Sequence, residues 1–143
     1  MGFERVWHKH YPKGTPAQVS IEEVTMPQAL ERTTSKFPEK TALVYMGKMI
    51  SYFELNGLVN CFANALIDLG VRPKDKVGML LPNMPQIIIA NLATQRIGAV
   101  CVMNNPLYTE PELQHQLNDS DATIIVTLDL LFPRMIKLSL IHI

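Results

Sequence analysis

Short apolar runs and helically spaced apolar residues alternate through the second half of the chain. Three runs are nearly free of polar residues: 77–81, 99–103 and 122–127. The segments between them place apolar residues three and four apart, as in a helix that crosses a sheet. Continuous apolar runs joined by helices are typical of parallel strands that are buried on both faces. The pattern therefore predicts an α/β fold: an open, layered arrangement with a largely parallel sheet flanked by helices.

The clearest helical pattern follows Ser51. Ser51 and Glu54 have the spacing of a capping box, and Gly70 provides a C-terminal stop. Between them, six apolar residues predict one continuous buried stripe: Leu55, Leu58, Val59, Phe62, Leu66 and Leu69. Four polar residues are expected on the opposite side of this helix: Asn56, Asn60, Asn64 and Asp68.

A second helix is predicted over 84–97, apolar almost all round and therefore buried on more than one side, with Gln95 and Arg96 as its solvent edge. The pattern alone leaves open a strand over 87–90. Thr109 and Glu112 form a second capping box, whose helix is expected to run to about Asn118, with Asp119 and Ser120 in a turn.

The first third of the chain predicts an arm, a helix and a hairpin. Residues 1–24 have no sustained period and suggest an extended arm anchored by Trp7, Tyr11 and Val19. A helix is expected over 25–36. A hairpin of 41–45 and 49–52 should turn at Gly47-Lys48. At the other end, 128–138 begins another amphipathic segment, and 139–143 is apolar with no stop signal, so we expect a truncation or a cloning scar there.

Composition and charge exclude several classes. Thirteen basic and thirteen acidic residues cancel, so no net charge attracts nucleic acid or an anionic membrane. No run approaches the ~18 apolar residues of a membrane span. The first residues show no secretory signal, which favours a cytoplasmic protein. Cys61 and Cys101 are accordingly expected to be reduced core residues rather than a disulfide.

Candidate chemistry is sparse. Polar residues follow the three predicted parallel strands, where ligands usually bind: Asn83, Asn104, Asn105 and Thr127. Asn at these positions is also a common cap and turn residue, and we favour that interpretation. The pairs His8/His10 and Asp119/Asp121, and the single His115, are better interpreted as solvated residues than as ligands or catalysts.

The sequence contains no glycine-rich phosphate-binding motif, since its glycines are scattered along the chain. We therefore predict no catalytic, cofactor-binding or metal-binding residue in this chain.

An ordered series of short motifs resembles a known family. The motifs are Gly70-Val71, Lys74-Asp75-Lys76-Val77, 81–85, Gly98-Ala99-Val100 and 105–113. Together they resemble the N-terminal part of adenylate-forming (AMP-binding) acyl-CoA synthetases, and are most similar to long-chain fatty-acid–CoA ligases. The resemblance covers about 25–138. It departs at Arg96, where many members have Lys, and the family's phosphate loop and acidic motifs have no counterpart here.

The resemblance implies a function for a longer protein. Such ligases use ATP and Mg²⁺ to convert a fatty acid to an acyl-adenylate, and CoA then displaces AMP. This chain would be the scaffold portion, binding none of those cofactors and inactive alone. The implied division is an arm at 1–24, the N-terminal part of the AMP-binding domain at 25–138 and the tail at 139–143.

Two alternatives stay open beside the resemblance. One is a self-standing, non-catalytic α/β binding or interaction module, and the other is a small nucleotide-binding enzyme, which the missing phosphate loop disfavours. Cutting a parallel sheet should leave open edges, so self-association of this chain is expected.

Overall fold

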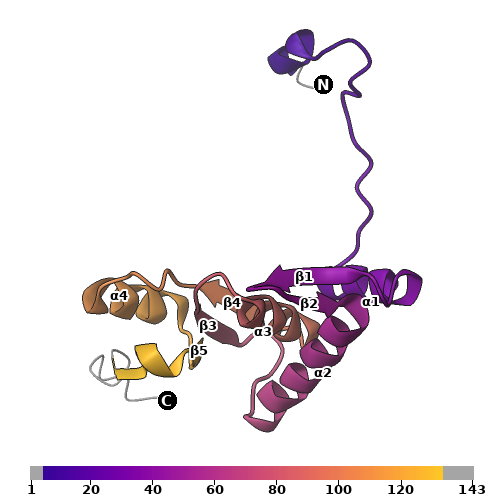
Figure 1. The fold of residues 1–143 in the computed structure, drawn as a ribbon. Helices are drawn as coiled ribbons and strands as arrows, with labels where there is room; N and C mark the ends of the chain where they lie inside the picture. Colours follow the sequence, from indigo (N-terminus) through magenta and orange to yellow (C-terminus); the bar gives the residue numbers. More distant parts are fainter. Residues whose placement is uncertain (1–4, 134–143) are drawn as a thin grey trace.

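The computed structural model describes residues 5–133 of the chain (Figure 1). It contains two short 3₁₀ helices, four α-helices and five strands in this part. The 3₁₀ helices are η1 (Val6–His10) and η2 (Asp129–Leu131). The α-helices are α1 (Met26–Lys36), α2 (Tyr52–Asp68), α3 (Pro85–Arg96) and α4 (Glu110–Ser120). The strands are β1 (Thr41–Tyr45), β2 (Lys48–Ser51), β3 (Lys76–Leu80), β4 (Val100–Met103) and β5 (Ile124–Thr127).

The predicted fold class is confirmed. Strands β3, β4 and β5 form a parallel sheet in the order β4-β3-β5, and β1 pairs antiparallel with β2 as a separate hairpin. Helix α3 connects β3 to β4, and α4 carries the chain from β4 back across β3 to β5. The strand that remained possible over 87–90 does not form, because those residues belong to α3.

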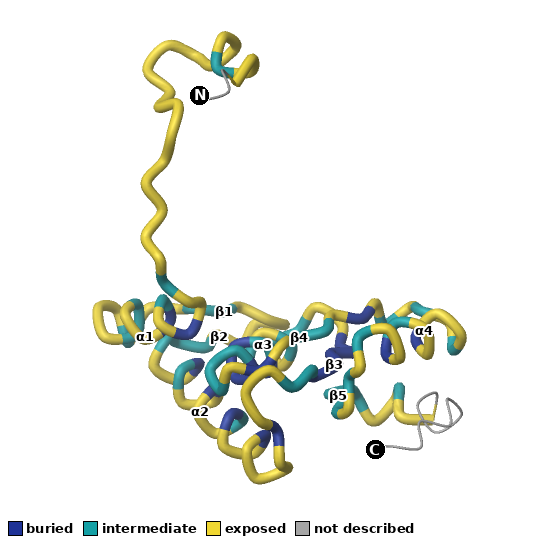
Figure 2. Tube along the Cα trace, turned by 180° about the vertical axis from the view of Figure 1, so that it is seen from behind, coloured by how far each residue is buried: buried dark blue, intermediate teal, exposed yellow. Residues whose placement is uncertain are grey.

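The central strand β3 is covered on both faces, as its apolar run predicts. Val77 and Met79 belong to the larger core, together with residues of α1, α2 and α3. Leu80 belongs to a smaller core with Leu113 and Leu117 of α4. Figure 2 shows the buried residues concentrated along β3 and the helix faces that meet it. Successive β3 side chains thus serve two cores, in keeping with the two-residue period of a strand.

Gly78 lies on the α4 side of β3, where space is short. A Cβ placed there would lie 3.1 Å from Ile125 Cγ1 and 3.2 Å from Leu117 Cδ2. The absence of a side chain at Gly78 therefore lets α4 and β5 pack directly against the central strand.

The two outer strands are less buried than expected. Both were predicted to be buried on each face, but β4 has exposed ends and β5 is half-buried throughout. The reason is their position, because each lies at an edge of the sheet. No further strand pairs with either edge in the described part of the chain.

The stripe on α2 is only partly correct. Leu55, Val59 and Leu66 are buried, together with Ala63, which the pattern did not include. Leu58 and Leu69 are exposed, and Phe62 is half-buried. A helical pattern shows which face of the helix is apolar, but not how much of that face other elements cover.

The helix ends follow the predicted capping chemistry closely. The Ser51 N–H donates to Glu54 Oε2 at 2.8 Å, and the Glu54 N–H donates to Ser51 Oγ at 3.2 Å. Gly70 ends α2 with a φ of 90°, where glycine is favoured. Helix α4 runs two residues further than predicted, so Asp119 and Ser120 are helical and Asp121 is the left-handed C-cap.

Two expectations for the first third of the chain are wrong. The hairpin turns at Met46-Gly47, one residue earlier than predicted, and both residues have positive φ. Trp7, Tyr11 and Val19 do not anchor the arm, because all three are exposed where it projects away from the body (Figure 1). At the base of the arm, Glu22 instead pairs with Arg32 of α1 at 2.7 Å. The rings of Trp7 and Tyr11 both lie near the His8 ring, with centroid distances of 6.2 and 5.3 Å.

The predicted amphipathic segment 128–138 lies partly, and the 139–143 tail wholly, outside the described residues. Among the described helices, none combines the length and the apolar character needed to cross a bilayer.

Candidate functional site

One concave feature of the described part of the chain is an apolar hollow of about 870 Å³. We use the name apolar hollow for this cavity, whose lining includes Met46, Met49, Leu58, Phe62, Ile89 and Val126. It is bounded by the β1–β2 hairpin, one side of α2, the first turns of α3 and the end of β5. Leu81 and Thr127 also line it, so it opens at the carboxyl ends of β3 and β5. That edge is where open α/β sheets usually bind ligands.

The lining of the apolar hollow is poor in polar chemistry. Lys48 is the single charged residue among the described residues that line it. The Thr127 hydroxyl already donates a hydrogen bond to the Leu80 carbonyl at 3.2 Å. Cys61 is a free, exposed thiol on the α2 wall, which corrects the expectation that it lies in the core. Such a lining suits apolar groups and offers no set of groups for acid–base or nucleophilic catalysis.

The asparagines that follow the strands do not converge on the apolar hollow. Asn105 is a turn residue, as we favoured, because its Oδ1 accepts the Leu107 N–H at 3.0 Å. Asn83 is exposed and does not cap α3, whose N-cap residue is Met84. Asn104 is 5% exposed, and its Nδ2 donates to the Val102 carbonyl at 2.8 Å. Its Oδ1 is buried with no hydrogen-bond partner among the described residues.

A polar cluster around Arg96 was not predicted. The Arg96 side chain is 13% exposed, so its assignment to a solvent edge is wrong. Its Nη2 donates to Asn56 Oδ1 at 2.9 Å and lies 3.5 Å from Glu31 Oε1, while its Nη1 donates to Asn60 Oδ1. One guanidinium thereby joins α1, α2 and α3, through fixed donors that match several acceptors at once.

The spacing of two asparagines in the sequence does point to this cluster. Asn56 and Asn60 are four residues apart on α2, so both face the same way, and a cation on a neighbouring helix suits two amide oxygens on one face. The sequence does not reveal which cation, because Arg96 lies 36 residues beyond Asn60.

The two capping carboxylates titrate below their ordinary range. The hydrogen bond from the Ser51 backbone, and then that from its hydroxyl, lowers the pKa of Glu54. The Thr109 hydroxyl at 2.7 Å, followed by its backbone N–H at 2.8 Å, lowers the pKa of Glu112. Both shifts are explained by helix capping.

The remaining candidates stay apart. His115, Asp119 and Asp121 are exposed on or just after α4, and His8 and His10 lie on the arm. No group of three or more His, Cys, Asp or Glu capable of holding a metal occurs among residues 5–133. Cys101 is half-buried, and burial raises the pKa of its thiol, which donates to the Asn91 carbonyl at 3.5 Å.

The structure is thus an open α/β domain with an apolar hollow at the carboxyl edge of its parallel sheet, and comparison with known proteins identifies the family. Residues 30–140 match the family of AMP-binding enzymes. Because that match spans most of the sequence, the chain belongs to the AMP-binding enzyme family.

Relatives of known function support this assignment. The chain is 34% identical over all of its 143 residues to a long-chain-fatty-acid–CoA ligase of Bacillus subtilis, of which it covers 26%. A second ligase of this name, from Salmonella typhimurium, is 33% identical over 125 residues, 86% of this chain and 22% of that protein. The chain therefore spans about a quarter of the length of the curated relatives that it matches.

Solved structures agree with the fold. An inhibitor-bound N-terminal domain of FACL13 from Mycobacterium tuberculosis superimposes with a TM-score of 0.74 at 25% identity, covering 78% of this chain and 28% of that one. The N-terminal subdomain of Klebsiella oxytoca NpsA, in complex with anthranilyl-AMSN, gives a TM-score of 0.71 at 26% identity, covering 73% and 27%. Recognition of the N-terminal part of an adenylate-forming enzyme from the motif series is thus confirmed.

Proposed function

We propose that this chain is the scaffold portion of a ligase that activates a fatty acid with ATP to an acyl-adenylate and then transfers the acyl group to CoA. The observation that carries the proposal is the family match over residues 30–140, joined to similarity over all 143 residues of this chain with about a quarter of a long-chain-fatty-acid–CoA ligase. Fatty acid, ATP and CoA are the partners proposed for the longer protein.

In this proposal, the residues of this chain hold the sheet and its helices in place and take no part in the chemical steps. The Arg96 cluster holds α1, α2 and α3 against one face of β3, and α4 covers the other face. This packing fixes the carboxyl ends of β3 and β5, at which the apolar hollow opens. Adenylate chemistry needs a cradle of N–H groups and cations for the leaving pyrophosphate, and no glycine-rich phosphate loop is present in the sequence.

Mg²⁺, which the family implies, does not fit the described residues. Mg²⁺ prefers several oxygen ligands in an octahedral arrangement. The carboxylates of Glu54 and Glu112 are each committed to their own helix N-terminus, and no cluster of candidate ligands occurs in the part of the chain that the structure describes. We assign no step to a metal ion here, and we propose no catalytic or cofactor-binding residue in this chain.

The proposal keeps the division into an arm at 1–24, a family domain part at 25–138 and a tail at 139–143. It also keeps a cytoplasmic location, in keeping with the two unpaired thiols Cys61 and Cys101. We further propose that the isolated chain self-associates. Within residues 5–133 no strand pairs with the outer edges of β4 and β5, which supports this, because strand edges pair readily with other chains and a net charge of zero opposes association little.

ATP–pyrophosphate exchange dependent on a long-chain fatty acid tests the proposal. The purified chain, supplied with ATP, Mg²⁺, labelled pyrophosphate and palmitate, should give no exchange above a control without protein. Exchange that requires both palmitate and the chain would show that these residues carry catalytic chemistry, contrary to the scaffold role.

A further inference from the structure

The arm before α1 stands apart from the packed part of the chain. Figure 1 shows residues 5–24 projecting from α1 to a tip that holds η1. No residue of η1 is buried, and all of residues 5–23 except His8 are exposed. The tip can therefore contact a partner without any change in the two cores of the body.

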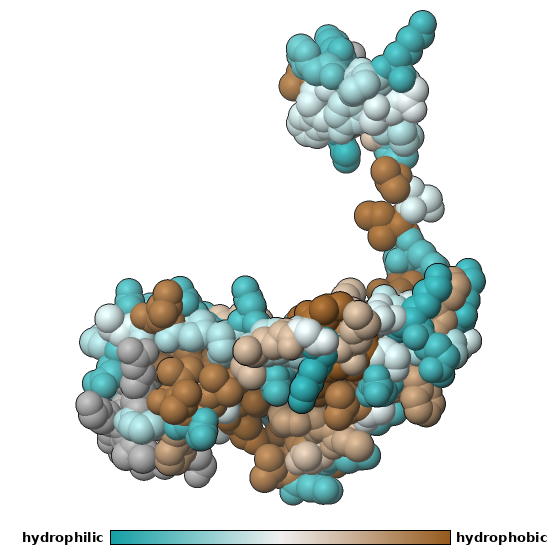
Figure 3. Space-filling view, in the orientation of Figure 1, coloured by the Kyte–Doolittle hydropathy of each residue, from teal (hydrophilic) through white to brown (hydrophobic). Residues whose placement is uncertain are grey.

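Apolar and aromatic side chains recur along this exposed arm. Val6 is 68% exposed and Trp7 52% exposed at the tip, and Val19 and Ile21 are more than 70% exposed nearer the body. Figure 3 shows apolar side chains along the arm between its tip and the body. Single exposed apolar residues are common, but several on one projecting segment indicate an interaction surface.

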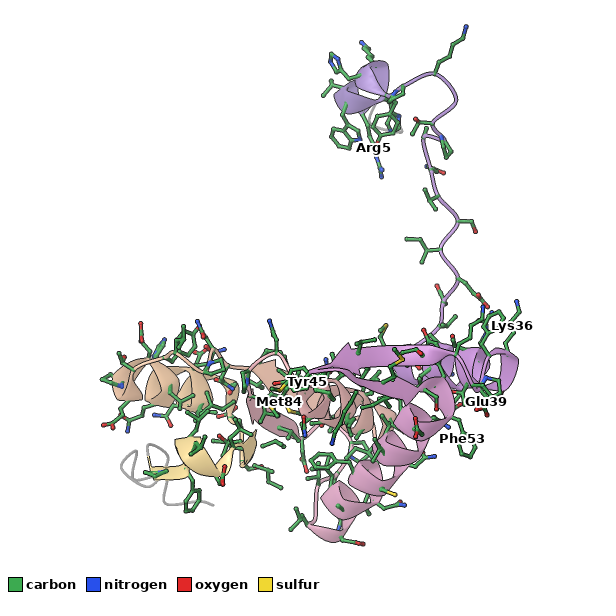
Figure 4. All side chains as sticks on the ribbon, in the orientation of Figure 1. Arg5, Lys36, Glu39, Tyr45, Phe53 and Met84 are labelled. Atoms are coloured by element: carbon green, nitrogen blue, oxygen red, sulfur yellow. The ribbon has the colours of Figure 1, made fainter. Side chains whose placement is uncertain are left out.

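The neutral total of the chain hides an uneven distribution of charge. Residues 1–21 contain three basic side chains, Arg5, Lys9 and Lys13, and one acidic side chain, Glu4. The remaining ten basic and twelve acidic residues follow, so the arm is basic and the rest of the chain is acidic. At the tip, labelled by Arg5 in Figure 4, the Arg5 Cζ lies 5.8 Å from the centre of the Trp7 ring. Basic and aromatic groups thus occur together there.

An anionic membrane surface fits this combination of side chains best. Trp and Tyr are enriched where a bilayer meets water, because each has an apolar ring with one polar group. Lys and Arg are attracted to anionic headgroups, and short apolar side chains enter the boundary between headgroups and acyl chains. Nucleic acid would attract the same cations, but Val6, Val19 and Ile21 have no polar group for its phosphates and no ring for its bases.

We propose that the arm binds the surface of a membrane that contains anionic lipids, with Trp7 and Tyr11 at the headgroups and the three basic residues drawn to the lipid phosphates. The inference goes beyond the proposed function and does not depend on it. Binding of this kind lies on the membrane surface and needs no helix that crosses the bilayer. It is weak and reversible, since each basic residue strengthens binding by only about fivefold.

Trp7 provides a local probe, because it is the single tryptophan of the chain and lies on the arm. The whole chain is mixed with vesicles of one-third phosphatidylglycerol and two-thirds phosphatidylcholine, and separately with vesicles of phosphatidylcholine alone. Tryptophan emission should shift to shorter wavelength only with the anionic vesicles, as the ring leaves water. Raising the salt from about 0.1 M to about 1 M should reverse the shift, because the screening length falls from about 10 Å to about 3 Å.

Two pairs of substitutions separate the arm from the body at equal total charge. Lys9→Gln with Lys13→Gln removes two charges from the arm, and Lys36→Gln with Lys40→Gln removes two exposed charges from the body. Co-sedimentation with anionic vesicles should be about thirtyfold weaker for the arm pair, at about fivefold for each charge, and almost unchanged for the body pair. The arm pair leaves both cores intact, because neither lysine is buried.

Several results would overturn the inference. Unchanged Trp7 emission with anionic vesicles is one, and equal weakening by the two pairs of substitutions is another. An equal shift with phosphatidylcholine alone would exclude the role of charge. A shift that grows with protein concentration in the absence of lipid would make a second copy of the chain the partner instead. Tighter binding to a single-stranded oligonucleotide than to the anionic vesicles would make the partner a nucleic acid.

Discussion

Replacing Leu66 by Ala should destabilise the chain far more than replacing Leu69, although both belong to the same apolar stripe. Leu66 is 1% exposed in the core shared by α1, α2 and α3, whereas Leu69 is 70% exposed at the end of α2. Leu→Ala removes three carbon groups, and at about 0.8 kcal/mol each the transfer term at a buried site is about 2.4 kcal/mol. The cavity that remains raises the cost of Leu66→Ala to about 3–4 kcal/mol.

At Leu69 most of the side chain is already in water. Scaling the transfer term by its buried fraction leaves roughly 0.7 kcal/mol, with no cavity to add. Urea unfolding followed by far-UV circular dichroism measures both values. Fluorescence would not serve, because Trp7, the single tryptophan, lies on the projecting arm outside the core. Equal midpoints for the two variants, or a loss below ~1 kcal/mol for Leu66→Ala, would refute the packing described for α2.

Three further predictions concern the helix clamp, pH and association. Arg96→Lys should cost about 1–2 kcal/mol of unfolding free energy by losing the paired hydrogen bonds to Asn56 and Asn60, while the control Arg72→Lys at an exposed position should cost almost nothing in the same urea assay. Because the folded pKa of Glu54 lies below its ordinary value of 4.5, its stabilising effect is present above that pH and is lost as the pH falls through the folded value. Glu54→Gln should therefore flatten the loss of stability on acidification below about pH 4.5, and an unchanged acid profile would count against the capping interaction. Sedimentation velocity over a concentration series should show a dimer or larger species of the isolated chain, and a monodisperse monomer at high concentration would contradict self-association through the sheet edges.

Most of the element succession was predictable because its signals are local. Capping pairs such as Ser51/Glu54 and Thr109/Glu112 fixed where helices begin, and the apolar run that became β3 fixed the centre of the sheet. The hairpin turn was one residue out because a two-residue turn can be placed by its glycine in two ways, and here the strained position falls on Met46 with a φ of 47°.

Long-range features were harder to predict. The sequence shows that Leu58 and Leu66 share the apolar side of α2, but the difference in their burial depends on which other elements cover that helix. Arg96 looked like a surface residue because its partners, Asn56 and Asn60, belong to another helix.

The apolar hollow itself could not be predicted, because its walls come from four separate elements whose meeting is a property of the tertiary fold. Recognition of the family did not depend on any of these contacts, since it rested on an ordered series of turn and strand motifs.

The central claim is that this chain is the scaffold part of a fatty-acid-activating ligase, and one assay addresses it most directly. Palmitate-dependent ATP–pyrophosphate exchange is measured on the chimera that carries residues 1–138 in place of the corresponding part of the Bacillus subtilis ligase, beside the isolated chain. The account predicts exchange by the chimera and none by the chain. A chimera that folds and melts like the unmodified ligase but gives no exchange, or an isolated chain that does give exchange, would contradict it.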